Sequence, residues 1–152
     1  MKRHKLNLWR IVVIIHFKKN KNFKLTFNVD KQNNLICVSL NIYTIYLEYD
    51  LFLKSLQEVY KAYNKALGEK QSIALQNIKS VCLEPVYEDK ADFIVCKYLK
   101  IYCSTHNEEY PVIKFWLEFK KTDINTSALF HKNLRYCQLD FVEIETLLEK
   151  FK

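Results

Sequence analysis

Alternating apolar and polar positions in the first third of the chain predict a series of strands. In residues 23–29 every second position is Phe, Leu or Val, and the positions between them are Lys, Thr and Asn. Residues 9–17 keep one continuous apolar face, while the opposite face mixes apolar residues with Arg10 and His16. Residues 35–47 are rich in β-branched and aromatic side chains and predict one or two further strands.

The apolar period then changes to that of a helix. Phe52, Leu56 and Val59 recur at spacings of four and three residues. Asp50 is available as an N-cap, and Gly68 is the expected stop. This part of the chain therefore predicts three or four strands followed by one helix.

The second half predicts the same order of elements. Alternation in residues 99–103 and 112–120 indicates two strands, and residues 128–139 indicate a hairpin. Asp140 begins a last helix, with Glu143 three residues later in the pattern of a capping box.

A shift of 92 residues superimposes parts of the two halves without a gap. The matched parts are a strand, the junction between strand and helix, and the apolar stripe of the helix: residues 23–27 fall on 115–119, 47–49 on 139–141, and 52–59 on 144–151. We interpret this match as an internal repeat; the alternative is two similar stretches produced by ordinary patterning. The predicted fold class is α+β, with two pseudo-symmetric antiparallel β-sheet units that are each followed by a helix, β-β-β(-β)-α repeated.

The repeat also predicts the domain organisation. Residues 1–68 form the first unit, residues 69–97 a connecting segment in which 72–83 are a candidate strand, and residues 98–152 the second unit. The two units are expected to pack about a pseudo-twofold axis as one compact domain, with the helices between the sheets and two open sheet faces.

Glycine content and charge restrict what the chain can bind. The single glycine, Gly68, rules out the glycine-rich loops that hold nucleotide phosphates. Residues 1–47 carry nine Lys and Arg and one acidic residue, whereas residues 48–152 carry fifteen basic and sixteen acidic residues. A positive field on one part of the chain suits a polyanion, either nucleic acid or an anionic membrane surface; the alternative is a solvated, Lys-rich face.

The residue types of catalysis and metal binding are not arranged as a site. The five cysteines include no CxxC pair, and the four histidines do not cluster with them. No spacing places a nucleophile beside a base. We therefore predict a protein that is not an enzyme, has no metal site and no cofactor, and keeps its cysteines reduced inside the cell.

The apolar run at residues 11–15 is interpreted as a strand and not as a signal peptide. It is short, lysines follow it, and no small-residue cleavage site is present. No stretch approaches the ~20 apolar residues of a membrane span. The expectation is an intracellular protein in a nucleus or host nucleus, not secreted and without a membrane partner. Abundant Lys, Asn and Ile suggest an AT-rich coding genome such as that of an insect virus, a parasite or an endosymbiont.

The end of each unit resembles a known single-stranded DNA-binding fold. Residues 112–119 form an alternating strand, residues 131–139 a basic loop and short strand, and residues 141–148 the start of a helix. In this order they resemble the positive-cofactor-four transcriptional coactivators, which are related in shape to the Whirly and PUR proteins. Residues 46–63 resemble the PUR repeat, and the likeness covers about 50–60 residues of each half, without the turn glycines of the family or its Lys-Gly before the short strand.

The resemblance implies binding of single-stranded or unwound DNA on an exposed sheet face, in transcription or replication. Members of the family generally act as dimers, and two fused units would supply that dimer within one chain. The expected partners are single-stranded DNA, in preference to RNA or duplex, and transcription or replication proteins, with the chain itself a monomer or homodimer.

Binding of a single strand requires cations and flat side chains along one face. The outward positions of the predicted strands and the basic loop provide ten candidates: Arg10, His16, Lys24, Lys100, Tyr102, Lys114, Trp116, Lys120, Lys132 and Arg135. For the aromatic candidates the alternative is partial burial between the two units. For each lysine the alternative is a solvated side chain.

Two other functions fit the same composition. A protein–protein interaction or structural module, for example a viral accessory protein, would also use abundant Tyr, Phe and Trp. A saddle similar to the TATA-binding protein would repeat a strand-rich unit at this spacing and would contact duplex DNA with apolar wedges.

Overall fold

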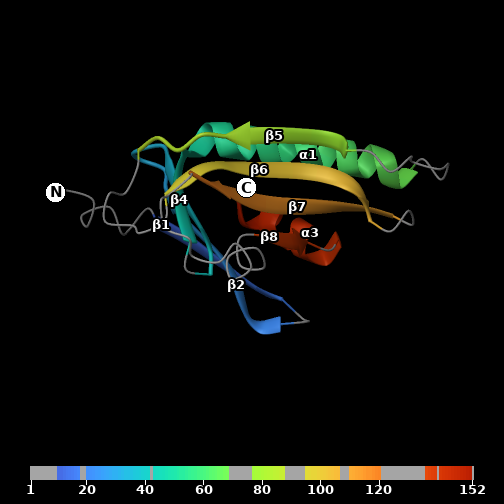
Figure 1. Ribbon diagram of the computed structural model, residues 1–152, viewed down its shortest axis with the longest axis horizontal. Coiled ribbons are helices and arrows are strands. Elements are labelled where there is room, and N and C mark those ends of the chain that lie inside the picture. Colours follow the sequence, from blue (N-terminus) through green and yellow to red (C-terminus); the bar gives the residue numbers. More distant parts are fainter. Residues whose placement is uncertain are drawn as a thin grey trace.

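Two four-stranded antiparallel sheets and two helices make up the computed structural model, which describes residues 10–17, 20–41, 43–68, 77–87, 95–106, 110–120, 136–139 and 141–151 (Figure 1). The first unit contains β1 (Arg10–Phe17), β2 (Asn20–Asp30), β3 (Leu35–Leu40), β4 (Tyr43–Glu48) and α1 (Tyr49–Gly68). The second unit contains β5 (Asn77–Leu83), β6 (Cys96–His106), β7 (Tyr110–Phe119), β8 (Tyr136–Leu139) and α3 (Phe141–Lys150). The chain therefore has the predicted α+β fold, with two β-sheet units that are each followed by a helix.

Both sheets are meanders in which each strand pairs with the next. The first sheet has the order β1-β2-β3-β4 and the second the order β5-β6-β7-β8. The edge strand β5 lies within residues 69–97, the segment expected to connect the units, and places Val81 opposite Ile101 of β6. Residues 35–47 form two strands, β3 and β4, which pair with each other.

The repeat is present in the order of elements, but the strands do not keep one offset. α1 begins at Tyr49 and α3 at Phe141, so the strand-to-helix junction keeps the offset of 92 residues. Residues 23–27 lie in β2, the second strand of its sheet, whereas residues 115–119 lie in β7, the third strand. Sixteen residues separate β7 from β8 and only two separate β3 from β4, which shifts the strands relative to the helices. The predicted superposition of these two strands is wrong, because alternation of period two matches at any even offset.

Two asparagines form left-handed turns in a chain that has almost no glycine. Asn34 has a φ of 50° and Asn41 a φ of 58°. The side-chain oxygen of Asn41 accepts a hydrogen bond from the backbone N–H of Lys24 (3.0 Å), and that of Asn34 accepts one from the backbone N–H of Asp50 (2.9 Å). Asp50 lies inside the first turn of α1, so Asn34 supplies the cap that was expected from Asp50.

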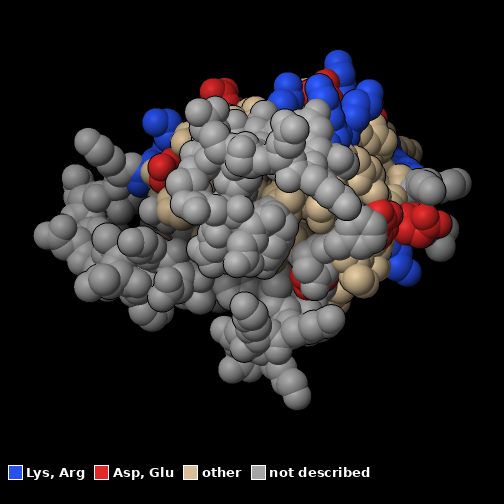
Figure 2. Space-filling model, turned by 90° about the vertical axis from the view of Figure 1, so that its right-hand side faces the viewer, with Lys and Arg blue, Asp and Glu red and all other residues tan. Residues whose placement is uncertain are grey.

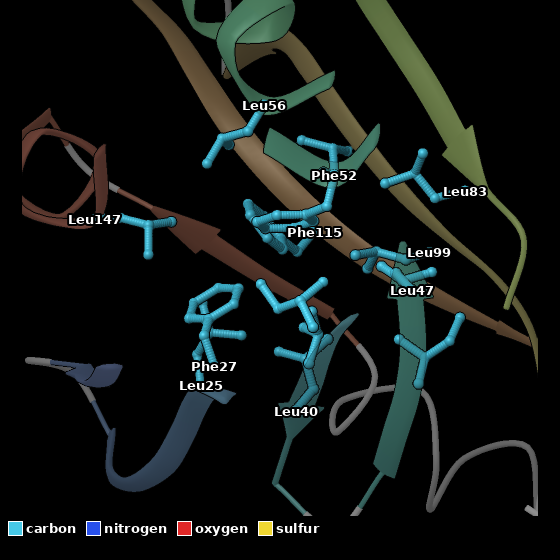
Figure 3. Close-up of a cluster of buried hydrophobic side chains, with 14 of the residues drawn as sticks. Leu25, Phe27, Leu40, Leu47, Phe52, Leu56, Leu83, Leu99, Phe115 and Leu147 are labelled. Carbon is cyan, nitrogen blue, oxygen red and sulfur yellow. The ribbon is translucent and has the colours of Figure 1, made fainter. Parts of the chain in front are cut away.

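One hydrophobic core joins the two sheets and both helices, and Figure 3 shows its side chains converging from all of them. Inward positions alternate along the strands: Leu25, Phe27 and Val29 of β2 are fully buried. α1 packs against β5, β6 and β7 of the second sheet as well as β3 and β4 of its own, and α3 contacts β1. The helix of the first unit therefore covers the inner face of the second sheet.

Four aromatic rings meet at the centre of this core, one from each layer. The ring centroid of Phe27 in β2 lies 5.7 Å from Phe52 in α1, 6.1 Å from Phe115 in β7 and 5.6 Å from Phe151 at the end of α3. The last two contacts are edge-to-face, the favoured geometry for aromatic pairs. Phe27 thus contacts the second sheet and both helices at once.

The sheets also meet at their sides. The segment after β5 continues along the free edge of β4, where the backbone N–H of Val86 donates to the carbonyl of Tyr46 (2.9 Å). Tyr43 of β4 packs against Phe119 of β7, with centroids 4.8 Å apart. These contacts protect the β4 edge from pairing with other strands.

We expect Phe27→Ala to lower the free energy of unfolding by about 3–5 kcal/mol, the usual cost of removing a buried ring. Because Phe27 contacts both halves of the core, the variant should still unfold in a single transition, with its midpoint at a lower urea concentration. Urea denaturation followed by far-UV circular dichroism and by tryptophan fluorescence measures both properties. Leu51→Ala, at an exposed position of α1, is the control. Two separate transitions would contradict a shared core.

The role of Asn34 is tested by two substitutions of different kind. Asn34→Gly keeps the left-handed turn but removes the cap, and Asn34→Ala removes the cap and also disfavours the turn. We expect losses of about 1 kcal/mol for the glycine variant and about 2 kcal/mol for the alanine variant, measured by urea denaturation. Equal stability of the wild type and Asn34→Ala would contradict this assignment.

Candidate functional site

The outward face of the second sheet places cations beside aromatic rings on three neighbouring strands. Its inward positions are buried, including Leu99, Ile101, Phe115 and Leu117, so the residues between them point away from the core. We call six of these outward residues the second-sheet face; they are Lys100, Tyr102, Lys114, Trp116, Tyr136 and Gln138, all half-buried. Tyr98 and Glu118 pair with each other in the adjoining row, so a carboxylate borders this face.

Strand register arranges the second-sheet face in two rows. One row runs from Lys100 through Trp116 to Tyr136 across β6, β7 and β8. The next row runs from Tyr102 through Lys114 to Gln138. The lysine lies on β6 in the first row and on β7 in the second, so each lysine has an aromatic ring next to it both along its own strand and on the neighbouring strand. This arrangement depends on which residues of each strand point outward and on how the strands are paired.

The side chains make the contacts that the register allows. The Lys100 Nζ lies 4.6 Å from the centroid of the Tyr102 ring. The Lys114 Nζ lies 5.9 Å from the same ring and 5.6 Å from the Tyr136 ring. Trp116 and Tyr136 meet edge to face, with centroids 6.0 Å apart. Cation–π attraction of this kind holds the ammonium groups over the sheet and leaves N–H donors for a ligand.

Partial burial changes the titration of this face. Burial lowers the pKa of Lys114 below its ordinary value. Burial, assisted by the neighbouring Tyr102 and Cys137, raises the pKa of Tyr136 to about 12, and burial also raises the pKa of Tyr102. Both phenols are therefore neutral near pH 7, and neither repels a phosphate.

The structure brings four of the ten predicted site residues together on the second-sheet face: Lys100, Tyr102, Lys114 and Trp116. Lys120 follows β7 and is exposed. Lys24 is exposed on the other sheet, in β2. Arg10 and His16 are placed only as backbone positions of β1, and Lys132 and Arg135 lie outside the described residues.

Tyr136 was missing from the predicted site. The signal was present, because Tyr136-Cys137-Gln138-Leu139 alternates and Leu139 and Cys137 are buried. The expected hairpin over residues 128–139 obscured it, since no side of that hairpin was assigned to the core.

The outward face of the first sheet has a different character. Its half-buried positions include Thr26, Asn28, Ser39 and Thr44, and the Ser39 and Thr44 hydroxyls hydrogen-bond at 3.0 Å. Tyr46 stacks on Tyr87 of the following segment, with centroids 4.7 Å apart. The first sheet therefore presents hydroxyl and amide groups beside Lys24, where the second presents two lysines among half-buried rings.

The cysteines of the described residues differ in burial and are all free thiols. Cys96, Cys103 and Cys137 are buried, and Cys82 is exposed. Burial raises the pKa of Cys103 to about 11, which keeps its thiol protonated. Within the part of the chain that the structure describes, no three His, Cys, Asp or Glu side chains gather as a metal site. Neither α1 nor α3 is long and apolar enough to cross a membrane.

No family model, curated protein or solved structure matches this chain.

The lowered pKa of Lys114 predicts a dependence of stability on pH. The unfolded state binds more protons than the folded state between the lowered pKa and the usual 10.5, so stability should rise as pH rises through this window. Lys114→Met should flatten that rise. Urea denaturation of both proteins at pH 7 and at pH values approaching 10.5 measures the difference, and parallel curves would contradict a partly buried Lys114.

Proposed function

We propose that the chain binds single-stranded nucleic acid on the second-sheet face, without catalysing a reaction. The observation that carries the proposal is the alternation of Lys100, Tyr102, Lys114, Trp116 and Tyr136 over three adjacent strands. Single-strand binding needs cations for the phosphates and flat rings for the bases, within reach of one another. The sheet supplies both with spacings set by strand geometry.

Two features favour a single strand over a duplex. The rings can stack only on bases whose faces are free, and a duplex hides those faces between neighbouring base pairs. A saddle that bends duplex DNA would instead need apolar wedges on its concave face. The outward positions of residues 98–102, 114–118 and 136–138 carry Tyr, Lys, Trp, Glu and Gln.

The rings within the second-sheet face have different roles in this proposal. Tyr102 has lysine ammoniums near its ring, so it orients cations toward phosphates. Trp116 is the platform for stacking, and Tyr136, which meets it edge to face, shares Lys114 with Tyr102. The resemblance to the positive-cofactor-four and PUR proteins supports DNA over RNA and a place in transcription or replication inside the cell.

Fluorescence anisotropy with labelled single-stranded and double-stranded oligonucleotides tests the proposal. We expect tighter binding to the single strand at low salt and a linear fall of log K with log salt concentration. Replacing one phosphate-contacting lysine, Lys100→Gln or Lys114→Gln, should reduce the salt slope by about 0.7. Absence of binding to either oligonucleotide at low salt would overturn the proposal.

Stacking is tested separately from charge. Trp116→Ala should weaken single-strand binding by about 1–3 kcal/mol, the usual contribution of one stacked base, with little change in the salt slope. Tyr87→Ala removes an exposed ring beside the first sheet and is the matched control, as Lys31→Gln is for the lysines. Equal losses for Trp116→Ala and Tyr87→Ala would place the site elsewhere.

A further inference from the structure

α1 and α3 lie side by side as antiparallel helices with an open groove between them. Phe52, near the start of α1, packs on Phe151 at the end of α3, with centroids 5.8 Å apart. Further along, the Tyr60 hydroxyl donates a hydrogen bond to the Glu145 carboxylate of α3. The order of these two contacts fixes the antiparallel direction.

The groove has an apolar floor and an acidic side. It has a volume of about 320 Å³ and is lined by Leu53, Gln57, Tyr60, Glu145, Leu148, Glu149 and Phe151. Both charged residues in this lining are carboxylates of α3, one helical turn apart.

Two exposed apolar side chains continue the apolar stripes of α1 and α3 beyond the lining of the groove. Leu67 lies two turns beyond Tyr60 on the same stripe of α1 and is 40% exposed. Val142 precedes Glu145 by one turn on α3 and is 63% exposed. Because the helices are antiparallel, both side chains extend the same end of the groove, where large apolar residues would otherwise be unfavourable in water.

The two sides of the groove carry opposite charge. On α1, beyond Gln57, the exposed strip contains Lys54, Lys61 and Lys65 together with Glu58. On α3 the side next to the groove carries Glu145 and Glu149, and Lys150 is exposed at the end of the helix. Figure 2 shows Lys and Arg gathered at the top of this view, on the side where Figure 1 places α1 and β5, and a separate group of Asp and Glu below.

We propose that this α1–α3 face joins two copies of the chain in a symmetric dimer. A twofold axis along the groove sets α1 of each copy against α3 of the other. The lysine strip of one copy then meets the carboxylate strip of its partner twice, and Leu53, Tyr60, Leu67 and Val142 are enclosed between four helices. In this orientation a patch with an apolar centre and opposite charges on its two sides is complementary to itself. A dimer that set α1 against α1 would bring the two lysine strips together.

Helix packing supports this arrangement. In four-helix bundles, each helix contributes a stripe of apolar side chains to a common centre, and α1 and α3 expose stripes of this kind. The second-sheet face lies on the opposite side of the β6–β7 sheet layer from α1, so it stays open in the dimer. The dimer is therefore independent of the proposed nucleic-acid binding and would present two such faces.

Charge reversal tests the dimer through its symmetry. Sedimentation velocity and light scattering should give the wild type a mass of twice 18.3 kDa at high concentration, with dissociation on dilution. The pair Glu145→Lys with Glu149→Lys and the pair Lys54→Glu with Lys61→Glu should each raise the dimer dissociation constant at least about tenfold. Mixing these two variants should restore a dimer, since each supplies the charge that the other has lost.

The control is Lys31→Glu with Lys97→Glu, which changes the same charge at exposed positions in the β2–β3 turn and in β6. It should leave the dissociation constant of the dimer unchanged. Circular dichroism and thermal unfolding establish that each variant is folded. A wild type that sediments only at 18.3 kDa overturns the proposal and leaves the groove to a different protein. Charge-reversed variants that fail to associate when mixed overturn it as well.

Discussion

Burial of the ring of Phe27 against Phe52, Phe115 and Phe151 is the interaction on which the rest of this fold depends. These four residues come from β2, α1, β7 and the end of α3, so no half of the chain can form the contact alone. An antiparallel sheet with one apolar face must cover that face. Here the second sheet is covered largely by α1, the helix that belongs to the first unit. The two units are consequently parts of one cooperative structure.

This shared core determines what remains available at the surface. With the inner faces of the sheets and the buried sides of the helices packed in the core, the described residues leave the outer face of each sheet and the α1–α3 groove at the surface. They differ in chemistry. The second sheet offers Lys100 and Lys114 among rings, the first sheet offers hydroxyls and amides, and the groove offers apolar side chains between strips of opposite charge. The outer faces of the two sheets are therefore alike in backbone and unlike in chemistry.

The near-absence of glycine has been accommodated by asparagine. Asn34 and Asn41 adopt positive φ at turns, which asparagine tolerates better than other non-glycine residues, and their side chains also accept backbone hydrogen bonds. Glycine would supply the turn but not these bonds. The turn between β2 and β3 is therefore coupled directly to the start of α1 through Asn34.

The sequence by itself determined the fold class, the inward residues of β2, β6 and β7, and the extent of α1 to Gly68, because period-two and helical patterns report directly on which face is buried. It also identified Lys114 and Trp116 as outward neighbours on one strand. Only the tertiary structure decided that β2 occupies the same place in its sheet as β6, and not β7, because an alternating pattern matches equally well when one strand is shifted by any even number of residues. Only the register brought Tyr136 beside Trp116 and Lys114, because contacts across strands depend on pairing between distant segments. The pairing of α1 with α3 was equally hidden, since each helix pattern specifies a buried side but not the helix that lies next to it.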